Sequence, residues 1–227
     1  MAAQIARMLQ SGPDALPPFL VVGIGYRFDR TKNLAAQYFD TRTHNFTAVP
    51  DPDWLEMSRA ALAEHGVEVS TATGGASAFL AFIEEELKPF IAARHNVDSG
   101  DQALTGMSLG GLFALHVLFH APQSFSRYAA LSPALWWNQG ELFRNESALA
   151  ARTNDLALGL FLSVGDREEG DDTPYTSVSS LRKMYEILAS RRYPSLKLVH
   201  QVFADETHIS VYPAAFCRAL RAFFAQQ

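Results

Sequence analysis

One short stretch, Thr105-Gly106-Met107-Ser108-Leu109-Gly110-Gly111, constrains the fold more than any other part of the chain. Residues 102–105 predict the end of a short strand, and residues 109–119 predict a helix because they are apolar and contain no proline. A strand, then Gly-x-Ser-x-Gly, then a helix is typical of a nucleophile elbow, in which the serine occupies a sharp, strained turn. We therefore expect the Ser108 oxygen to stand clear of the edge of a sheet.

The backbone after Ser108 has a second expected role. The N–H of Leu109 lies at the N-terminus of the predicted helix, where it would face a negative oxygen formed on a substrate. Gly-x-Ser-x-Gly also arises by chance in long chains. The strand–helix context and the third glycine, Gly111, favour the functional interpretation.

Length and composition exclude several classes of protein. A chain of 227 residues suits one α/β domain, expected over residues 1–227, and its 48% hydrophobic content supports a full core. The net charge of -5 gives no electrostatic footprint for nucleic acid. There is no apolar run of about 18 residues, so no membrane span is expected. The single cysteine, Cys217, excludes an intrachain disulfide and fits a reducing compartment.

The first residues show no charged region followed by an apolar one, so they do not predict a signal peptide. A cytoplasmic location is expected for the chain as written. A periplasmic one would follow if an export signal preceded Met1.

Strands and helices alternate along most of the chain. Strands are expected at residues 19–24, 102–105, 128–131, 156–164 and 196–203, and helices at residues 5–9, 53–65, 76–94, 109–119, 178–190 and 210–225. The run 19–24 predicts a central strand buried on both faces, residues 26–52 predict a long ordered loop, and Pro89 predicts a helix kink. Alternation of this kind predicts a mostly parallel sheet in a three-layer α/β/α arrangement.

Reactive side chains follow three of the predicted strands. Ser108 follows one, an acidic cluster containing Asp166, Glu168 and Glu169 follows the next but one, and His208 follows the last. Active sites of parallel sheets lie outside the carboxyl ends of the strands, and the order serine, acid, histidine is that of the α/β-hydrolases. Ser108 would be the nucleophile, His208 the base, and the acid would fix the tautomer of His208 and stabilise its charged form.

Glu168 is the preferred acid because it stands three residues after the strand-ending glycine, Gly165. Asp166 is the alternative, and a Ser–His dyad without an acid stays open. His116 and His120 have the i, i+4 spacing of metal ligands, but Val117 stands where a metalloprotease helix has glutamate. No metal and no other cofactor is therefore expected.

Five segments match a single family pattern: Val21-Val22-Gly23-Ile24-Gly25-Tyr26, residues 42–50, the Gly74-Gly75 pair with the pattern through residue 91, residues 106–112, and Ser132-Pro133-Ala134-Leu135-Trp136-Trp137. Together they resemble the esterases that include esterase D, enterochelin (enterobactin) esterases and related siderophore esterases. The chain departs from the family pattern at Asn45, where aspartate is usual, and at Met107, where histidine is usual.

This resemblance implies an α/β-hydrolase fold and hydrolysis of carboxylic esters through an acyl-enzyme. Arg42 would bind an acidic or catecholate group, Trp136 and Trp137 would form a pocket wall, and Gly25 and Tyr26 would lie near the elbow beside the oxyanion. A surface arginine and two core tryptophans fit these positions equally well. Relatives carry about three earlier strands, and the turn after the third supplies a second oxyanion N–H, so the resemblance implies a sheet without its N-terminal strands.

Three functions follow from these observations. The leading one is a siderophore-type serine esterase acting on a small-molecule ester, in that branch a catecholate trilactone or its linear products. The alternatives are a general short-chain ester or thioester hydrolase resembling S-formylglutathione hydrolase, and a non-catalytic domain of the same fold. The oligomeric state is not predicted.

Overall fold

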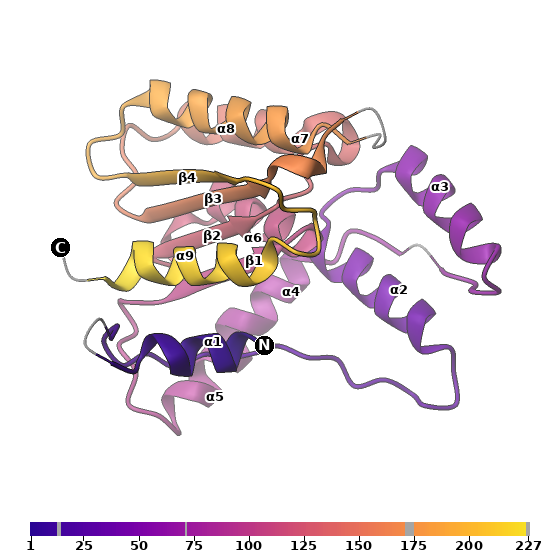
Figure 1. Cartoon of the computed structure of the whole chain (residues 1–227), viewed down its shortest axis with the longest axis horizontal. Coiled ribbons are helices and arrows are strands. Elements are labelled where there is room, and N and C mark those ends of the chain that lie inside the picture. The colour runs from indigo at the N-terminus through magenta and orange to yellow at the C-terminus, as the bar shows by residue number, and fades with distance from the viewer. Residues whose placement is uncertain (13–14, 71, 171–174, 226–227) are drawn as a thin grey trace.

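The computed structural model describes residues 1–12, 15–70, 72–170 and 175–225 (Figure 1). In chain order its elements are α1 (Ala2–Leu9), α2 (Leu34–Phe46), α3 (Pro52–Ala63), α4 (Ala76–Phe82), the π-helical turn η1 (Ile83–Leu87), α5 (Lys88–Ala92), β1 (Ala103–Met107), α6 (Leu109–His120), η2 (Pro122–Ser124), β2 (Arg127–Leu131), α7 (Trp137–Ala150), β3 (Gly159–Gly165), η3 (Asp166–Glu168), α8 (Ser177–Arg191), β4 (Lys197–Phe203) and α9 (Tyr212–Phe224).

The four strands form one parallel sheet in the order β1-β2-β3-β4. Each strand is joined to the next by a segment containing a helix, as a parallel connection requires. All four carboxyl ends therefore lie along one edge of the sheet, which is the edge where α2 and α3 extend from the body in Figure 1.

Helices cover both faces of the sheet, giving three layers. Successive residues of β2 point to opposite faces, so Tyr128 and Ala130 pack in one buried cluster while Ala129 and Leu131 pack in another. The first cluster includes buried residues of α6, α7 and α8, and the second includes those of α9 and α1. The predicted α/β/α arrangement with a parallel sheet is confirmed.

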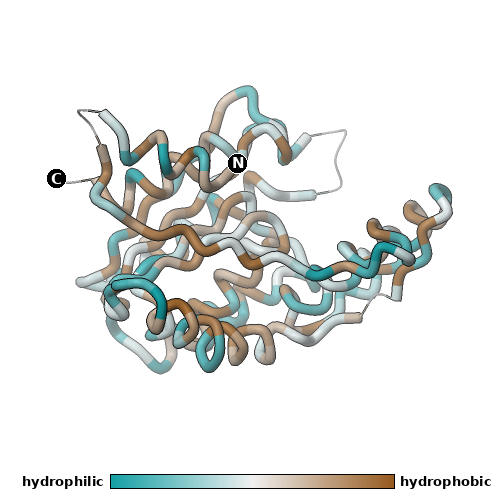
Figure 2. Tube along the Cα trace, turned by 90° about the horizontal axis from the view of Figure 1, so that it is seen from below, coloured by the Kyte–Doolittle hydropathy of each residue, from teal (hydrophilic) through white to brown (hydrophobic). Residues whose placement is uncertain are grey.

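The strand predicted at residues 19–24 is wrong. This stretch is extended but belongs to no strand, and Leu20, Val22 and Ile24 are exposed. In Figure 2 it is part of the long segment that crosses the underside of the molecule. A strand needs a hydrogen-bonding neighbour, and β1 pairs only with β2 in the described residues. The apolar run therefore predicts a buried strand, but no described strand lies beside it to pair with it and bury it.

The predicted loop at residues 26–52 is also partly wrong, because it contains α2. The Asn33 side chain accepts a hydrogen bond from the Ala36 N–H at 3.1 Å and so caps this helix. Its sequence lacks the apolar stripe that predicts a packed helix, and the helix accordingly has few buried residues. The next helix, α3, is predicted over residues 53–65 and runs over Pro52–Ala63. The Asp51 side chain caps it by accepting a hydrogen bond from the Trp54 N–H at 3.1 Å.

The helix predicted at residues 76–94 is present as α4, η1 and α5 in succession. The irregularity expected from Pro89 takes the form of the wide π-helical turn immediately before it. Proline lacks an N–H and its ring crowds the preceding turn, which a wider turn accommodates. Among the described residues, no helix combines the length and apolar character needed to cross a bilayer.

Candidate active site

Ser108 occupies the sharp turn between β1 and α6. Its φ of 61° and ψ of -122° lie outside the regions that non-glycine residues favour. Two backbone bonds hold this conformation: the Ser108 N–H donates to the Leu131 carbonyl at 3.0 Å, and the Leu112 N–H donates to the Ser108 carbonyl at 2.9 Å. The strained turn expected from Gly-x-Ser-x-Gly is therefore present, and its neighbours enforce it.

The glycines around Ser108 are required by close packing. A Cβ on Gly106 would lie 2.0 Å from the Gly110 carbonyl oxygen, so strand and helix can approach only if this residue is glycine. A Cβ on Gly111 would lie 3.0 Å from the Pro133 Cα, so the third glycine brings α6 against the turn after β2. Leu109 is the first residue of α6, and N–H groups in the first turn of a helix have no acceptor within that helix.

Glu168 and His208 meet at the same edge of the sheet. Glu168 lies in η3 directly after β3, and His208 lies in the connection from β4 to α9. The His208 Nδ1 is 2.6 Å from Glu168 Oε2. The Glu168 side chain is 2% exposed and that of His208 is 44% exposed. A buried carboxylate thus holds one ring nitrogen of a partly exposed imidazole.

The second oxygen of Glu168 is also fully engaged. Glu168 Oε1 accepts a hydrogen bond from the Ser132 hydroxyl at 2.6 Å and another from the Gly165 N–H at 2.7 Å. Ser132 follows β2 and was not singled out in the sequence. The only signal was its place directly after a predicted strand, the same signal that selected the other three residues.

The connections that carry Glu168 and His208 are also joined to each other. The Arg167 N–H donates to the Glu206 carbonyl at 3.1 Å, and the Arg167 side chain pairs with Asp205 at 2.5 Å. A Cβ on Gly165 would lie 2.2 Å from the same Glu206 oxygen. Because the two backbones touch, the position of the acid depends on that of the histidine loop.

The other candidate acid, Asp166, has different surroundings. It is exposed and lines a hollow of about 500 Å³ beside α8, together with Glu169 and Arg182. Glu169 accepts a hydrogen bond from the Ser179 N–H at 2.6 Å. Of the three acids considered, Glu168 is the one whose hydrogen bond to His208 is observed.

His116 and His120 stack on each other at 4.1 Å between ring centroids. His120 Nδ1 is 2.8 Å from the His116 carbonyl oxygen, and the buried His116 Nδ1 has no hydrogen-bond partner in the described part of the chain. Burial, with a smaller effect of His120, lowers the pKa of His116 to about 4. No group of three or more residues with metal-ligand side chains gathers within the described ranges.

The two tryptophans expected in a pocket wall have different environments. Trp137 is fully buried and its indole N–H donates to the Val49 carbonyl at 2.9 Å, so it belongs to the core and the expectation is wrong for it. Trp136 is partly exposed and stacks on Tyr175 at 4.6 Å between centroids. Arg42 lies on α2, with its guanidinium over the rings of Tyr38 and Phe46.

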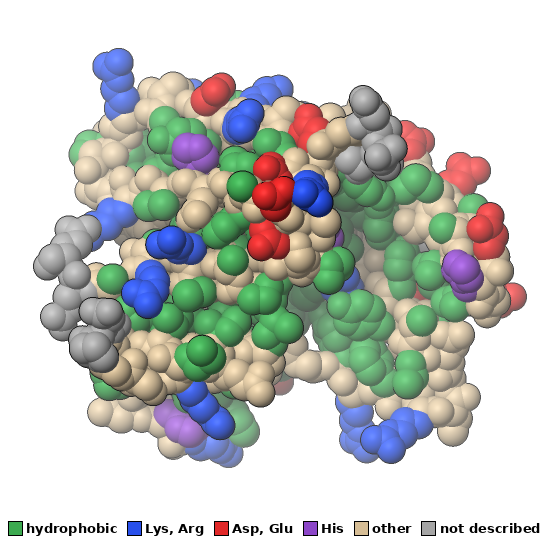
Figure 3. Space-filling view, in the orientation of Figure 1, with side chains coloured by type: hydrophobic (Ala, Val, Ile, Leu, Met, Phe, Trp, Pro, Cys, Tyr) green, Lys and Arg blue, Asp and Glu red, His purple; other side chains and the backbone are tan. Residues whose placement is uncertain are grey.

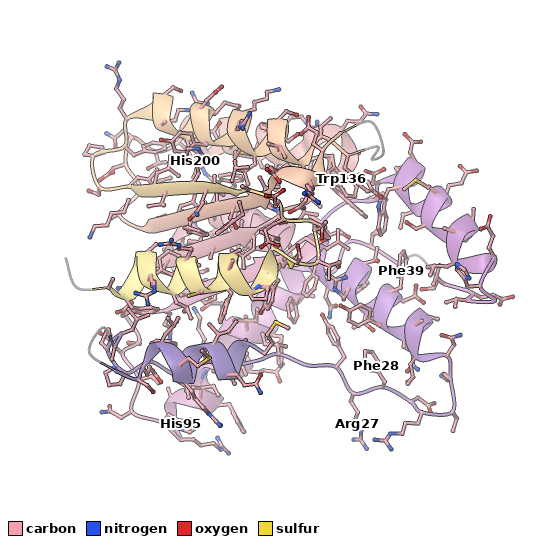
Figure 4. The ribbon with its side chains drawn as sticks, viewed as in Figure 1. Arg27, Phe28, Phe39, His95, Trp136 and His200 are labelled. Carbon is pink, nitrogen blue, oxygen red and sulfur yellow. The ribbon has the colours of Figure 1, made fainter. Side chains whose placement is uncertain are left out.

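Trp136 belongs to a row of four aromatic side chains, which we call the aromatic row: Phe39, Trp54, Trp136 and Tyr175. Each ring contacts the next, from α2 through α3 to the residues after β2 and η3. Figure 3 shows a hollow between the body and the part containing α2 and α3, with hydrophobic side chains along it. Figure 4 labels Phe39 on the α2 side and Trp136 at the facing edge of the body.

Gly25 and Tyr26 line a different hollow, of about 340 Å³. Its other lining residues are Ile24, Asn45, Ala78, Phe79 and Phe82. This lining does not include Ser108, Leu109, Glu168 or His208. A role for Gly25 or Tyr26 beside the oxyanion therefore stays a prediction from the resemblance.

Comparison with known proteins identifies the family. The family model described as "Putative esterase" matches residues 56–221, most of the chain. The chain belongs to this esterase family. The match begins in α3 and ends in α9, so it includes the elbow, Glu168 and His208.

A curated relative resembles the chain over most of its length. The chain is 32% identical to ferri-bacillibactin esterase BesA of Bacillus subtilis over 214 residues, which are 90% of this chain and 66% of BesA. The chain spans about two thirds or less of the length of the curated relatives it matches.

Solved structures of esterases and hydrolases share the fold. The BES protein from Bacillus cereus superposes with a TM-score of 0.75 at 28% identity, over 99% of this chain and 80% of that one. The siderophore hydrolase EstA from Aspergillus nidulans gives a TM-score of 0.74 at 26% identity, over 96% and 76% of the two chains. The predicted family and the α/β-hydrolase fold are confirmed.

Proposed function

We propose that this chain hydrolyses carboxylic esters of the siderophore type through an acyl-enzyme on Ser108. One observation carries the proposal: a buried carboxylate, Glu168, holds Nδ1 of His208 at the sheet edge where the strained turn presents Ser108. The names of the relatives, a ferri-bacillibactin esterase and a siderophore hydrolase, support the same reaction class.

The chemistry assigns one task to each group. The Ser108 hydroxyl attacks the ester carbonyl while Nε2 of His208 takes its proton. Glu168 keeps the remaining N–H on Nδ1 and stabilises the imidazolium. The carbonyl oxygen becomes negative and accepts a hydrogen bond from the Leu109 N–H at the positive end of α6. His208 then protonates the leaving alcohol. A water, deprotonated by His208, attacks the acyl-enzyme and releases the acid and free Ser108.

The aromatic row suits an ester that carries planar aromatic groups. Phe39, Trp54, Trp136 and Tyr175 are all partly exposed, so a flat ring can stack against them. Arg42 supplies a positive charge on α2, and its guanidinium would bind an anionic or catecholate group of the substrate. Both features agree with the substrate class implied by the resemblance to siderophore esterases.

Labelling with a fluorophosphonate tests the nucleophile. Such a probe reacts with an activated serine, so the wild-type chain should be labelled at Ser108. The Ser108→Ala and His208→Ala variants should not be labelled. Folded wild-type protein that takes no label would instead support a non-catalytic domain.

Competing substrates test the reaction class. A ferric catecholate trilactone should be hydrolysed faster, by kcat/KM, than S-formylglutathione. The reverse order would favour the general thioester hydrolase. Simple p-nitrophenyl esters do not separate the two, since both enzymes would cleave them.

A further inference from the structure

We propose that Ser132 is a positioning residue that holds the Glu168 carboxylate so that Oε2 faces His208. The effect of Ser132 on catalysis rests on the proposed function, whereas the hydrogen bond between Ser132 and Glu168 does not depend on it. The Ser132 hydroxyl donates to Glu168 Oε1 at 2.6 Å, on the oxygen opposite the one that meets His208.

Burial makes this hydrogen bond matter. Ser132 is 3% exposed and Glu168 is 5% exposed, so water does not replace a missing donor freely. A buried ionised carboxylate is stable only when its oxygens are hydrogen-bonded. Among the described residues Oε1 has two donors, the Ser132 hydroxyl and the Gly165 N–H, and of these the hydroxyl comes from outside the strand–turn segment that carries Glu168.

The backbone of Ser132 is arranged to make this contact. Its φ is 42°, a left-handed value that serine rarely adopts, and it directly precedes Pro133. The Ser132 N–H donates to the Ser163 carbonyl at 2.7 Å, which fixes the residue against β3. Since β2 lies between β1 and β3, Ser132 stands between the strand that presents Ser108 and the strand that presents Glu168.

The strained backbone allows a selective test. Glycine accepts φ of this sign without strain, so Ser132→Gly removes the hydroxyl while relieving the backbone. Ser132→Ala removes the hydroxyl and keeps the strain. If the hydroxyl positions Glu168, both variants should lower kcat by about 10- to 100-fold with little change in KM. Wild-type kcat in Ser132→Gly would overturn the proposal.

Ser163 provides a matched control. It is a second fully buried serine, next to Ser132 in the sheet, and its hydroxyl finds no hydrogen-bond partner among the described residues. Ser163→Ala should therefore leave kcat within twofold of wild type. An equal loss of kcat in Ser163→Ala and Ser132→Gly would show that the region tolerates no change and would count against a specific role for Ser132.

A double-mutant cycle separates positioning from general damage. If Ser132 acts through Glu168, then adding Ser132→Gly to Glu168→Gln should cause no further loss of kcat. Fully additive losses would overturn the proposal.

A final measurement does not need turnover. The proton between Glu168 and His208 Nδ1 gives a downfield NMR resonance, which should weaken or shift in Ser132→Gly and persist in Ser163→Ala. An unchanged resonance in Ser132→Gly would reject the positioning role even if the chain proved inactive. If Ser108 is not labelled but the NMR resonance changes as expected, the esterase proposal fails and the positioning role of Ser132 stands.

Discussion

At the scale of single residues, Glu168 and Asp166 stand two positions apart with opposite surroundings. Glu168 is buried with both oxygens engaged, whereas Asp166 is exposed. Because Glu168 is the one of these two acids that is hydrogen-bonded to His208, Glu168→Gln should lower kcat by about 10³- to 10⁴-fold through loss of the correct imidazole tautomer. Asp166→Asn should stay within twofold of wild type in the same steady-state assay. A loss of less than tenfold in both variants would favour a Ser–His dyad.

His116 makes a separate prediction about stability and pH. Its pKa in the folded chain is lowered to about 4, chiefly by burial, from an ordinary value of 6.5. Above 6.5 both states are neutral at this residue, and below it the unfolded chain takes up a proton that the folded chain does not. The free energy of unfolding should therefore fall by about 3 kcal/mol as the pH drops from 6.5 to about 4.

Urea unfolding at about pH 8 and about pH 5 would measure this loss. In His116→Gln the difference in unfolding free energy between the two pH values should shrink. His65→Gln, at an exposed position, is the control and should keep the wild-type difference. A His116→Gln variant with the full wild-type difference would contradict the assignment.

Residue type and position relative to strand ends predicted Ser108, Glu168 and His208 as neighbours of one sheet edge. The same reasoning does not predict Ser132, because its contact with Glu168 depends on a left-handed backbone conformation that the residue type does not indicate. The resemblance to siderophore esterases implied a pocket wall at both Trp136 and Trp137, because adjacent tryptophans look alike in sequence until the turn after β2 buries one of them. Local chemistry is therefore more predictable than side-chain direction.

At the scale of elements, the site depends on contact between the loops after β3 and β4. A Cβ on Gly165 would lie 2.2 Å from the Glu206 oxygen, so Gly165→Ala must push the two loops apart. Displacement of His208 from Glu168 by about 1 Å should lower kcat by about 100-fold, since catalytic groups tolerate little misplacement. Gly170→Ala is the matched control, because a Cβ there meets none of the described residues within 4 Å. Wild-type kcat in Gly165→Ala would show that the loops are not coupled.

The elements themselves were predictable where each apolar run has a partner. The strands at residues 103–107, 127–131, 159–165 and 197–203 lie beside one another, and the two inner ones, β2 and β3, are mostly buried. The run at residues 19–24 has the same signal but no neighbouring strand in the described residues, and it stays extended without joining the sheet. Helix α2 is the opposite case, a helix without the sequence signal of one. It is capped by Asn33 but has no apolar stripe from which it could be predicted.

At the scale of the whole molecule, the body and the part containing α2 and α3 meet along the hollow of Figure 3. The aromatic row crosses between them, since Phe39 and Trp54 come from α2 and α3 while Trp136 follows β2. Substrate recognition would therefore depend on both parts, whereas the chemistry proposed for Ser108 would depend on the sheet edge alone. Binding and rate should respond to different mutations.

The adjacent tryptophans separate these two contributions. Trp136→Ala should raise KM for an aromatic ester by up to about tenfold, through lost stacking, with little change in unfolding free energy. Trp137→Ala should instead lower the unfolding free energy by about 3–5 kcal/mol, because it opens a cavity in the core. Steady-state kinetics and urea unfolding of both variants measure the contrast. Equal KM values for wild type and Trp136→Ala would mean that the ester binds away from the aromatic row, and the substrate class argued from that row would then lose its structural support.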